Sequence, residues 1–253
     1  MKTKHIPKYI VVFDMDETLG HFEQLSIFWM VLTKYYRKYL KKKLSTEYLY
    51  NLIDNYFNKI LRPKILHIIK YLLNQRKNSI CDKIILFTNN PNREWSNQIA
   101  GYFSYKLEEP VFDQVIIAYK SKGKVLEENR RQYDKSYVDL LRCTNLDDDT
   151  KVCFLDDIRH EDMENKNVVY LKIKPYQYCY NLDKISLDYY NKNKDDIKNK
   201  NEFLNFMQET EEYGYKLFLK GNLEQKVDNI ISKRIKQLLE EFLEGKKKLL
   251  YTL

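Results

Sequence analysis

The sequence lacks any hydrophobic stretch that could span a membrane. Its longest fully apolar run covers only residues 27–32, whereas a membrane-spanning helix needs about 20 apolar residues. No apolar stretch with a small-residue cleavage site follows the lysines of residues 1–8, as it would in a secretory signal peptide. We therefore expect a soluble intracellular protein, cytoplasmic or nuclear, without a membrane partner.

Cysteine is also sparse and shows no pattern. The four cysteines are Cys81, Cys143, Cys153 and Cys179. No two of them have the close spacing that marks a zinc site or a redox pair. We expect reduced thiols without a role in metal binding.

Glycine and proline are scarce, with six and five residues, while lysine, asparagine, tyrosine and isoleucine are abundant. Such a composition is typical of an AT-rich genome, which is enough to explain the net charge of +8. The lysines are mostly dispersed among acidic residues, so nucleic acid is the less favoured partner. With 43% hydrophobic residues over 253 positions, we expect one packed domain with a sizeable appendage.

Five short apolar runs rich in β-branched residues are typical of strands buried in a parallel sheet, which is covered on both faces. They are residues 9–13, 83–87, 115–119, 151–155 and 168–173. Helical patterns separate the first four runs, which indicates right-handed strand–helix–strand units. The sequence therefore predicts a layered α/β fold.

A long segment between the first two strands has helical periodicity. Apolar side chains recur at helical spacing over residues 28–40 and again over residues 49–60, which predicts two helices in an insert of about residues 24–61. We expect Arg62 and Pro63 to open a third helix, with the proline in its first turn.

The sequence changes character after Pro175. Residues 191–201 are rich in lysine, asparagine and aspartate, so we expect a solvated linker there. Apolar residues at helical spacing over residues 223–242 then form one face of a helix of about six turns. Packing of this face on its own domain is the simpler interpretation, and dimerisation or a partner helix is the alternative. The expected domains are residues 1–180 and, as linker and helical C-terminal extension, residues 181–253.

Polar clusters follow three of the predicted strands. The clusters are Asp14-Met15-Asp16-Glu17-Thr18, Thr88-Asn89-Asn90 and Asp156-Asp157. Ligands of open parallel sheets bind at the carboxyl ends of the strands, so we expect these distant segments to converge on one crevice.

Carboxylates gathered in one crevice repel one another and need a cation. An all-oxygen set without histidine or cysteine suits Mg²⁺, which also binds phosphate oxygens. One of Asp14 and Asp16 can attack phosphorus while the other moves a proton, and Thr88 offers a hydroxyl group. A lysine or arginine should face the developing charge, and Lys135 has a modest lead because it begins a predicted helix that leads into the fourth strand. Its rivals are Lys120, Lys122, Lys124, Arg130 and Arg131. His160, like His5 and His67, has no partner pattern and is given no role.

The first cluster resembles the DxDxT signature of haloacid dehalogenase superfamily phosphatases. Asp16-Glu17-Thr18-Leu19, Arg62-Pro63, Phe87-Thr88 and Leu155-Asp156-Asp157 together resemble the RNA polymerase II C-terminal-domain phosphatases, also called NLI-interacting-factor-like. The resemblance covers about residues 9–175. It implies the haloacid dehalogenase fold, a Rossmann-like three-layer parallel sheet, here with a helical insert after the first strand and a helical C-terminal tail.

The resemblance also implies roles for single residues. Asp14 matches the nucleophile and a metal ligand, and Asp16 matches the general acid/base, whose backbone carbonyl also binds metal. Thr88 matches the phosphate-binding hydroxyl, and Lys135 matches the motif lysine.

The remaining matches concern the metal ion and the substrate. Asp156 matches a metal-ligating acid, and Asp157 its neighbour that binds the ion directly or through water. Asn89 and Asn90 stand where the family carries small residues. They either contact the substrate or cap the next helix.

The resemblance implies a Mg²⁺-dependent phosphatase that works through an aspartyl phosphate on phosphoserine or phosphothreonine in proteins. A phosphatase for a small metabolite or a nucleic-acid 3′-end is one alternative. An inactive binding module, with the C-terminal helix as its working surface, is another. The helical insert replaces the family's short flap, so we expect it to act as a small cap that restricts substrate access.

Overall fold

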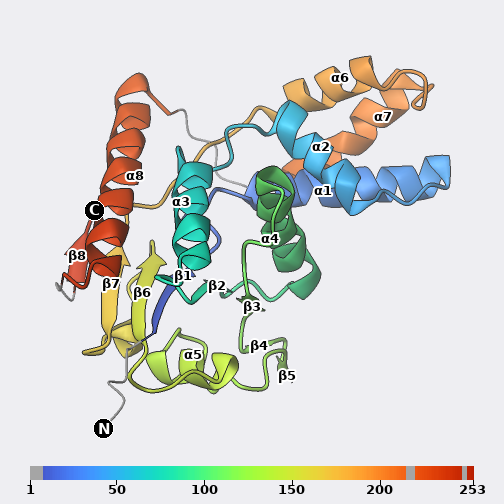
Figure 1. Cartoon of the computed structure of the whole chain (residues 1–253). Coiled ribbons are helices and arrows are strands. Elements are labelled where there is room, and N and C mark those ends of the chain that lie inside the picture. The colour runs from blue at the N-terminus through green and yellow to red at the C-terminus, as the bar shows by residue number, and fades with distance from the viewer. Residues whose placement is uncertain (1–7, 215–219, 247–249) are drawn as a thin grey trace, which may run out of the picture. The chain divides into compact units, whose positions relative to one another are not determined.

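The computed structural model describes residues 8–214, 220–246 and 250–253, which form two compact units (Figure 1). Of the described residues, 8–19, 62–176, 226–246 and 250–253 form unit 1, and 20–61, 177–214 and 220–225 form unit 2. This division differs from the boundary expected at residue 180. The helical insert groups with the segment that follows the sheet, and most of the C-terminal helix belongs to unit 1.

Unit 1 contains a six-stranded parallel sheet. Its strands are β1 (Tyr9–Phe13), β2 (Lys83–Phe87), β3 (Gln114–Ile116), β6 (Lys151–Asp156), β7 (Val168–Lys172) and β8 (Leu250–Thr252). They pair in the order β3-β2-β1-β6-β7-β8, and every pair is parallel. The predicted parallel α/β fold is therefore confirmed. β1 lies in the middle, so the loop that follows it reaches the centre of one sheet edge.

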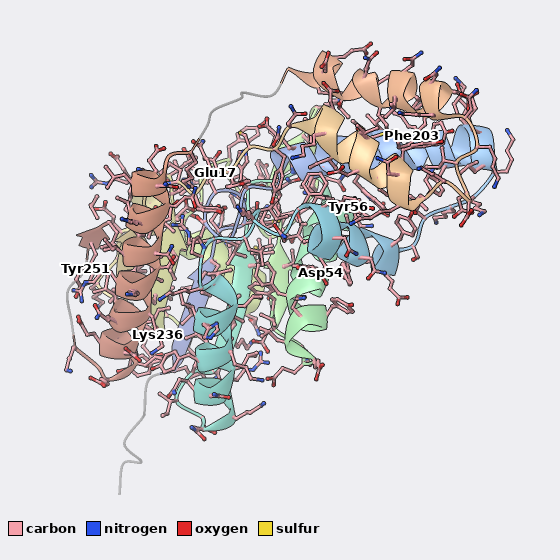
Figure 2. The ribbon with its side chains drawn as sticks, turned by 90° about the horizontal axis from the view of Figure 1, so that it is seen from above. Glu17, Asp54, Tyr56, Phe203, Lys236 and Tyr251 are labelled. Atoms are coloured by element: carbon pink, nitrogen blue, oxygen red, sulfur yellow. The ribbon has the colours of Figure 1, made fainter. Side chains whose placement is uncertain are left out.

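Helices cover both faces of this sheet (Figure 1). The helix α5 (Tyr137–Thr144) packs on one face, where its Tyr137 and Leu140 join a core with alternate strand residues such as Val12 and Phe154. The other face carries α3 (Ile65–Lys77), α4 (Arg93–Leu107) and α8 (Asn222–Leu243). Lys236 of α8, labelled in Figure 2, lies over the ring of Tyr71 in α3 at 4.7 Å, so these two helices are neighbours. The result is a three-layer, Rossmann-like α/β arrangement.

In unit 1, two local expectations were wrong and one strand was missed. The third strand ends at Ile116 rather than at residue 119, because the chain turns into a hairpin of β4 (Lys120–Ser121) and β5 (Lys124–Val125). Helix α3 begins at Ile65, since Lys64 has a left-handed backbone with φ of 61° and Pro63 precedes the helix. The edge strand β8 was not expected at all.

Most of the apolar face of α8 is buried within unit 1, whereas Leu223 and Ile230, two residues of the predicted face, are 75% and 65% exposed. Ile235, Leu238 and Leu239 are at most 1% exposed, and the ring of Phe242 meets the ring of Tyr9 edge to face with centroids 5.3 Å apart. The helix thus packs on its own unit, which is the simpler of the two interpretations of its sequence. A role of this helix in dimerisation or partner binding stays a prediction. Among the described residues, no helix is long and apolar enough to cross a membrane.

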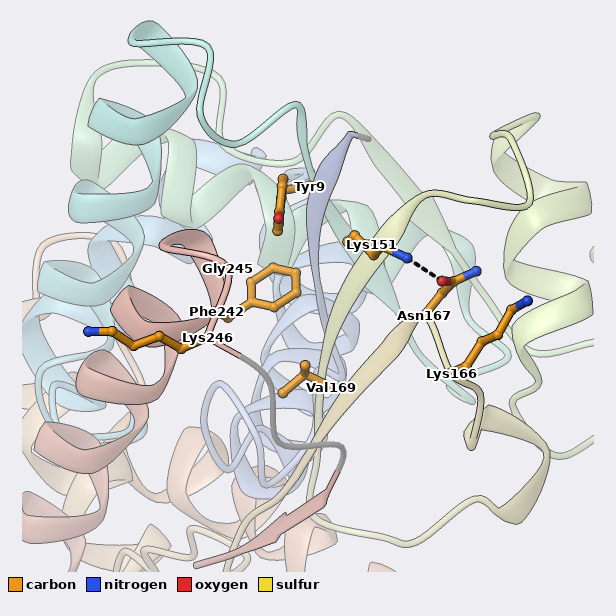
Figure 3. Close-up of a pocket in the computed structure, with 8 residues that line it drawn as sticks. All are labelled: Tyr9, Lys151, Lys166, Asn167, Val169, Phe242, Gly245 and Lys246. Atoms are coloured by element: carbon orange, nitrogen blue, oxygen red, sulfur yellow. Dashed lines mark hydrogen bonds between the residues drawn. The ribbon is translucent and has the colours of Figure 1, made fainter. Parts of the chain in front are cut away.

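A small pocket of about 30 Å³ lies at the edge of the sheet where the strands begin (Figure 3). Tyr9 and Lys151, the first residues of β1 and β6, line it, and Lys151 donates a hydrogen bond to Asn167. The ammonium groups of Lys166 and Lys246 point away from each other in Figure 3, so the lysines do not converge on one ligand. Because ligands of parallel sheets bind at the opposite edge, this pocket is no candidate active site.

Unit 2 is helical. Its elements are α1 (Glu23–Tyr35), the π-helical turn η1 (Tyr36–Leu40), α2 (Thr46–Tyr56), α6 (Leu182–Lys192), α7 (Lys200–Met207) and the 3-10 segment η3 (Gln208–Tyr213). The two predicted helices of the insert are present. The linker expected over residues 191–201 is present but shorter, at residues 193–199, because α6 runs to Lys192 and α7 starts at Lys200. Asn181 and Asn199, whose side chains cap these helices, are the start signals that a composition-based interpretation passes over.

Aromatic packing joins the insert to the later helices inside unit 2. The ring of Phe203, labelled in Figure 2, stacks on Tyr189 at 5.8 Å and meets Tyr35 edge to face at 5.0 Å. The hydroxyl groups of Tyr36, Tyr48 and Tyr189 hydrogen-bond to one another. The aromatic stripes of the insert therefore serve packing, as expected from the sequence.

The burial of α8 can be tested by a matched pair of substitutions. Leu239→Ala removes a fully buried side chain and should lower the free energy of unfolding by about 2–5 kcal/mol. Ile230→Ala removes a side chain that is 65% exposed on the same helix and should change it by less than about 0.5 kcal/mol. Urea denaturation measures both. Equal small effects would show that the face of Leu239 is not part of the core.

Candidate active site

Register brings two of the predicted acids to adjacent strand ends. Phe13 of β1 pairs with Leu155 of β6, and the amide of Asp14 donates to the carbonyl of Leu155 at 2.9 Å. Asp156 is the last residue of β6. The side chains of Asp14 and Asp156 therefore start from neighbouring positions although 142 residues separate them in the sequence.

Lys135 lies between these two carboxylates. Its ammonium group donates to Oδ1 of Asp14 and, at 2.7 Å, to Oδ2 of Asp156. Lys135 is 1% exposed. It directly precedes Ser136, whose hydroxyl caps α5 by accepting a hydrogen bond from the amide of Asp139 at 3.1 Å. The helix start thus fixes the backbone from which the lysine reaches the strand ends.

The ionised forms of Asp14 and Asp156 are not equally stabilised. Burial raises the pKa of Asp14 well above its usual range, and Lys135 only partly offsets this. Burial also disfavours the ionised form of Asp156, yet Lys135 and His160 hold the pKa of that carboxyl below its usual range. Burial alone would lower the pKa of Lys135, but the two carboxylates raise it. Asp14 is therefore the carboxylate that still needs a positive partner.

Asp157 completes an acidic cluster. Carboxylate oxygens of Asp14, Asp156 and Asp157 lie within 4.8 Å of one another, a spacing at which they can hold one metal ion. Burial, followed by the charge of Asp156, raises the pKa of Asp157 to about 6. The hydroxyl of Thr18 donates to Asp157 at 3.4 Å. With Lys135 as the ammonium group facing three carboxylates, the all-oxygen donor set and the residual negative charge fit a hard divalent cation.

Asp16 stands apart from this cluster. It is half-buried, and its Oδ2 accepts a hydrogen bond from the side-chain amide of Asn90 at 3.4 Å. The amide N–H of Asn90 in turn donates to Oγ1 of Thr88 at 3.0 Å. Asp16 and Thr88 thus share a neighbour in the loop after β2. The Asp16 side chain therefore lies outside the set of three carboxylates that could hold a metal ion.

Asn89 and Asn90, the residues after Thr88, form hydrogen bonds that stabilise the loop after β2. The side-chain oxygen of Asn89 accepts a hydrogen bond from Arg130 at 2.9 Å. Neither Asn89 nor Asn90 caps α4, because the capping residue is Asn92, which accepts from the amide of Trp95 at 3.0 Å. The capping alternative for Asn89 and Asn90 was therefore wrong, and contact of Asn89 with the substrate stays a prediction.

Two buried arginines brace the loops of the site. Arg130, a rival for the catalytic cation, donates to the carbonyls of Ile117 and Tyr133 at 2.8 Å. Arg62 donates to the carbonyls of Glu17 and Thr18 at 2.7 Å. Since the loop after β1 contains a left-handed residue at Glu17, with φ of 59°, these bonds hold a backbone shape that is otherwise unfavourable. Both guanidinium groups thus bind mainly backbone carbonyls of these loops, and among the described residues Arg62 Nη1 and Arg130 Nε have no hydrogen-bond partner.

His160 is a site residue that sequence reasoning missed. Its Nε2 lies 3.5 Å from Oδ2 of Asp156, and the residue is 5% exposed. The hydroxyl of Tyr170 accepts from the amide of His160 at 3.0 Å and donates to the carbonyl of Ile158 at 2.7 Å, which fixes the loop. The only available signal was the four-residue distance from Asp156, which by itself is uninformative.

Comparison with known proteins gives no matching sequence family and low-identity similarity to solved structures. No family model matches the sequence, and no curated protein sequence matches it. A solved phosphoserine phosphohydrolase-like protein from Francisella tularensis subsp. tularensis SCHU S4 is 15% identical with a TM-score of 0.35, over 65% of this chain and 87% of that one. A variant of the fission yeast RNA polymerase II CTD phosphatase Fcp1, bound to beryllium fluoride, is also 15% identical, with a TM-score of 0.39, over 96% of this chain and 68% of that one.

The raised pKa of Asp157 predicts a pH dependence of stability in metal-free protein. A carboxyl that binds its proton more tightly when folded stabilises the fold below its unfolded pKa of about 4, and this contribution is lost as the pH rises through about 6. Relative to wild type, Asp157→Asn should therefore gain about 1–3 kcal/mol of unfolding free energy between about pH 4 and pH 7. Urea denaturation in a chelator measures the difference. If the unfolding free energies of wild type and Asp157→Asn changed with pH in the same way, the prediction would be contradicted.

His160 is expected to support metal binding through Asp156. Loss of a side chain that orients a metal ligand commonly weakens affinity by about 10- to 100-fold, so His160→Ala should weaken divalent-cation binding by about 10-fold. Isothermal titration calorimetry with Mg²⁺ and Mn²⁺ measures this. His67→Ala, at an exposed position on α3, is the control, and equal affinities of the two variants would remove His160 from the site.

Proposed function

We propose that this protein is a Mg²⁺-dependent phosphomonoester hydrolase that works through an aspartyl phosphate on Asp14. The observation that carries the proposal is the buried arrangement in which Asp14 and Asp156, on adjacent strand ends, share the ammonium group of Lys135. Asp157 adds a third carboxylate within reach of one ion. Carboxylates that face both a fixed ammonium group and a metal ion form a site for a phosphate dianion.

The proposed reaction has two steps. A carboxylate oxygen of Asp14 attacks phosphorus, the bond to the ester oxygen breaks, and Asp16 gives its proton to the departing alcohol. Asp16, now ionised, takes a proton from a water molecule that attacks the aspartyl phosphate. This releases inorganic phosphate and regenerates the Asp14 carboxylate. The separation of Asp16 from the acidic cluster supports this division, because a proton carrier must not be held by the metal through its side chain.

Electrostatics decide which residues stabilise the transferred phosphoryl group. Asp14, Asp156 and Asp157 would hold Mg²⁺, which supplies positive charge that offsets the repulsion between the substrate and the carboxylates. Lys135 holds Asp14 in place and faces the same region, so it can pair with a phosphoryl oxygen. Thr88, at the carboxyl end of β2, is proposed to donate its hydroxyl to another.

The proposed substrates are phosphoserine and phosphothreonine residues of proteins. The support is the set of four sequence motifs, which occur in the same order as in the C-terminal-domain phosphatases. Three of these motifs follow the ends of strands, and the Arg62-Pro63 motif holds a loop of the site in place. Arg62 of the Arg62-Pro63 motif, for instance, holds the loop after β1. A cap function for the helical insert in unit 2 belongs to the same proposal.

The proposal is tested by hydrolysis of para-nitrophenyl phosphate. Wild type should hydrolyse it only with Mg²⁺, and Asp14→Asn should lose at least about 10³-fold in kcat because the nucleophile is gone. Asp147→Asn, which changes an exposed acid in the turn before β6, should leave kcat unchanged. An Asp14→Asn protein as active as the Asp147→Asn control would refute the nucleophile, provided both variants are folded by circular dichroism.

A further inference from the structure

The hairpin of β4 and β5 carries three lysines and no acidic residue. Residues 114–126 contain Lys120, Lys122 and Lys124 but no aspartate or glutamate. Lys122 and Lys124 are exposed, and no ion pair of the described residues involves either of them. Glu127, the first acid after the hairpin, is paired with Arg93 at 3.0 Å. The hairpin is therefore a net cationic surface.

The turn of this hairpin holds a lysine where its backbone disfavours one. Lys122 and Gly123 form the two-residue loop, with φ of 47° and 80°. Two-residue loops with positive φ at both positions favour asparagine, aspartate or glycine. Glycine meets this preference at the second position only.

The base of the hairpin is fastened to the loops of the candidate active site. The amide of Ala118 donates to the carbonyl of Asn90 at 3.2 Å, and Asn90 contacts Asp16. Arg130 joins the carbonyl of Ile117 to the side chain of Asn89. The hairpin thus rises from the same framework that places Thr88 and Lys135.

The hairpin also offers features that suit an extended peptide. In the part of the chain that the structure describes, its two strands pair only with each other, so no further strand covers either outer edge. Val125 is 44% exposed on one of these edges. Next to it, the ammonium group of Lys120 lies over the rings of Tyr119 and Tyr133 at 5.4 and 5.3 Å, and Tyr133 is 60% exposed.

We propose that this hairpin binds a negatively charged segment beside the phosphorylated residue, so that the enzyme prefers phosphoproteins with further phosphates or acidic residues near the scissile phosphate. The proposal rests on the proposed phosphatase function and names its substrate class. Lys122 and Lys124 supply the charge, and the open edge pairs with the extended substrate backbone. Peptide is favoured over nucleic acid because a sugar-phosphate chain has no amide groups to add to a strand.

Steady-state kinetics with three substrates test the proposal. The substrates are para-nitrophenyl phosphate, a singly phosphorylated serine peptide without acidic residues, and the same peptide with a second phosphoserine three residues away. Wild type should show a lower KM for the doubly phosphorylated peptide, and this preference should fall as salt rises from about 20 to about 200 mM. The double variant Lys122→Gln/Lys124→Gln should raise that KM by about 5- to 10-fold with kcat unchanged. Its kinetics on the other two substrates should match wild type.

The control for charge is Lys226→Gln/Lys233→Gln, which removes two exposed lysines from α8 and should leave all three substrates unaffected. Equal KM values of wild type and the hairpin variant for the doubly phosphorylated peptide would overturn this proposal alone. An effect of the hairpin variant on a 3′-phosphorylated oligonucleotide but not on the peptide would overturn it in favour of nucleic acid. A wild type inactive on para-nitrophenyl phosphate would instead overturn the phosphatase function on which this proposal rests.

Discussion

The ammonium group of Lys135 between the carboxylates of Asp14 and Asp156 is the interaction on which the rest of the site depends. Removing both acids and the lysine from water is costly, and the cost is offset only while the three groups hold one another. That arrangement requires β1 and β6 to be neighbours in register and α5 to begin directly after the lysine. The sheet order and the cap at Ser136 meet these two conditions.

The balance of charge at this point is incomplete without a further cation. Lys135 keeps Asp156 ionised, whereas the pKa of Asp14 stays raised by burial, and Asp157 adds another acid. A site of this kind favours a divalent ion, and it favours an anionic substrate only once that ion is bound. The same excess of buried carboxylates thus accounts for both the metal and the phosphate in the proposed reaction.

Around this centre, the loops are held by buried cations that bind no acid. Arg62 and Arg130 give most of their hydrogen bonds to backbone carbonyls, which fixes the shapes of the loops after β1 and β2. Such bracing allows residues as distant as Asp16 and Asn90 to meet without regular secondary structure. Arg130, which looks like a catalytic candidate by charge alone, is fully buried and gives its hydrogen bonds to loop carbonyls and Asn89.

Sequence patterns predicted the parts of this protein that depend on local burial. The strands at residues 9–13 and 83–87 were predicted to the residue, because fully covered strands are continuous apolar runs. The convergence of Asp14 and Asp156 followed from the geometry of parallel sheets. The left-handed residue at Lys64, the helices α6 and α7 in a lysine-rich segment and the proximity of His160 to Asp156 depend on tertiary contacts or on single capping residues. The periodicity of apolar residues in the sequence does not reveal these features.

The most direct test of the central claim is to locate the covalent phosphate. Wild type mixed with a phosphomonoester and Mg²⁺, quenched rapidly in acid and digested with protease, should yield a peptide that carries phosphate on Asp14, as measured by mass spectrometry. Phosphate on Asp16, or hydrolysis that proceeds with no phosphorylated aspartate, would contradict the account in which the buried carboxylate held by Lys135 is the nucleophile.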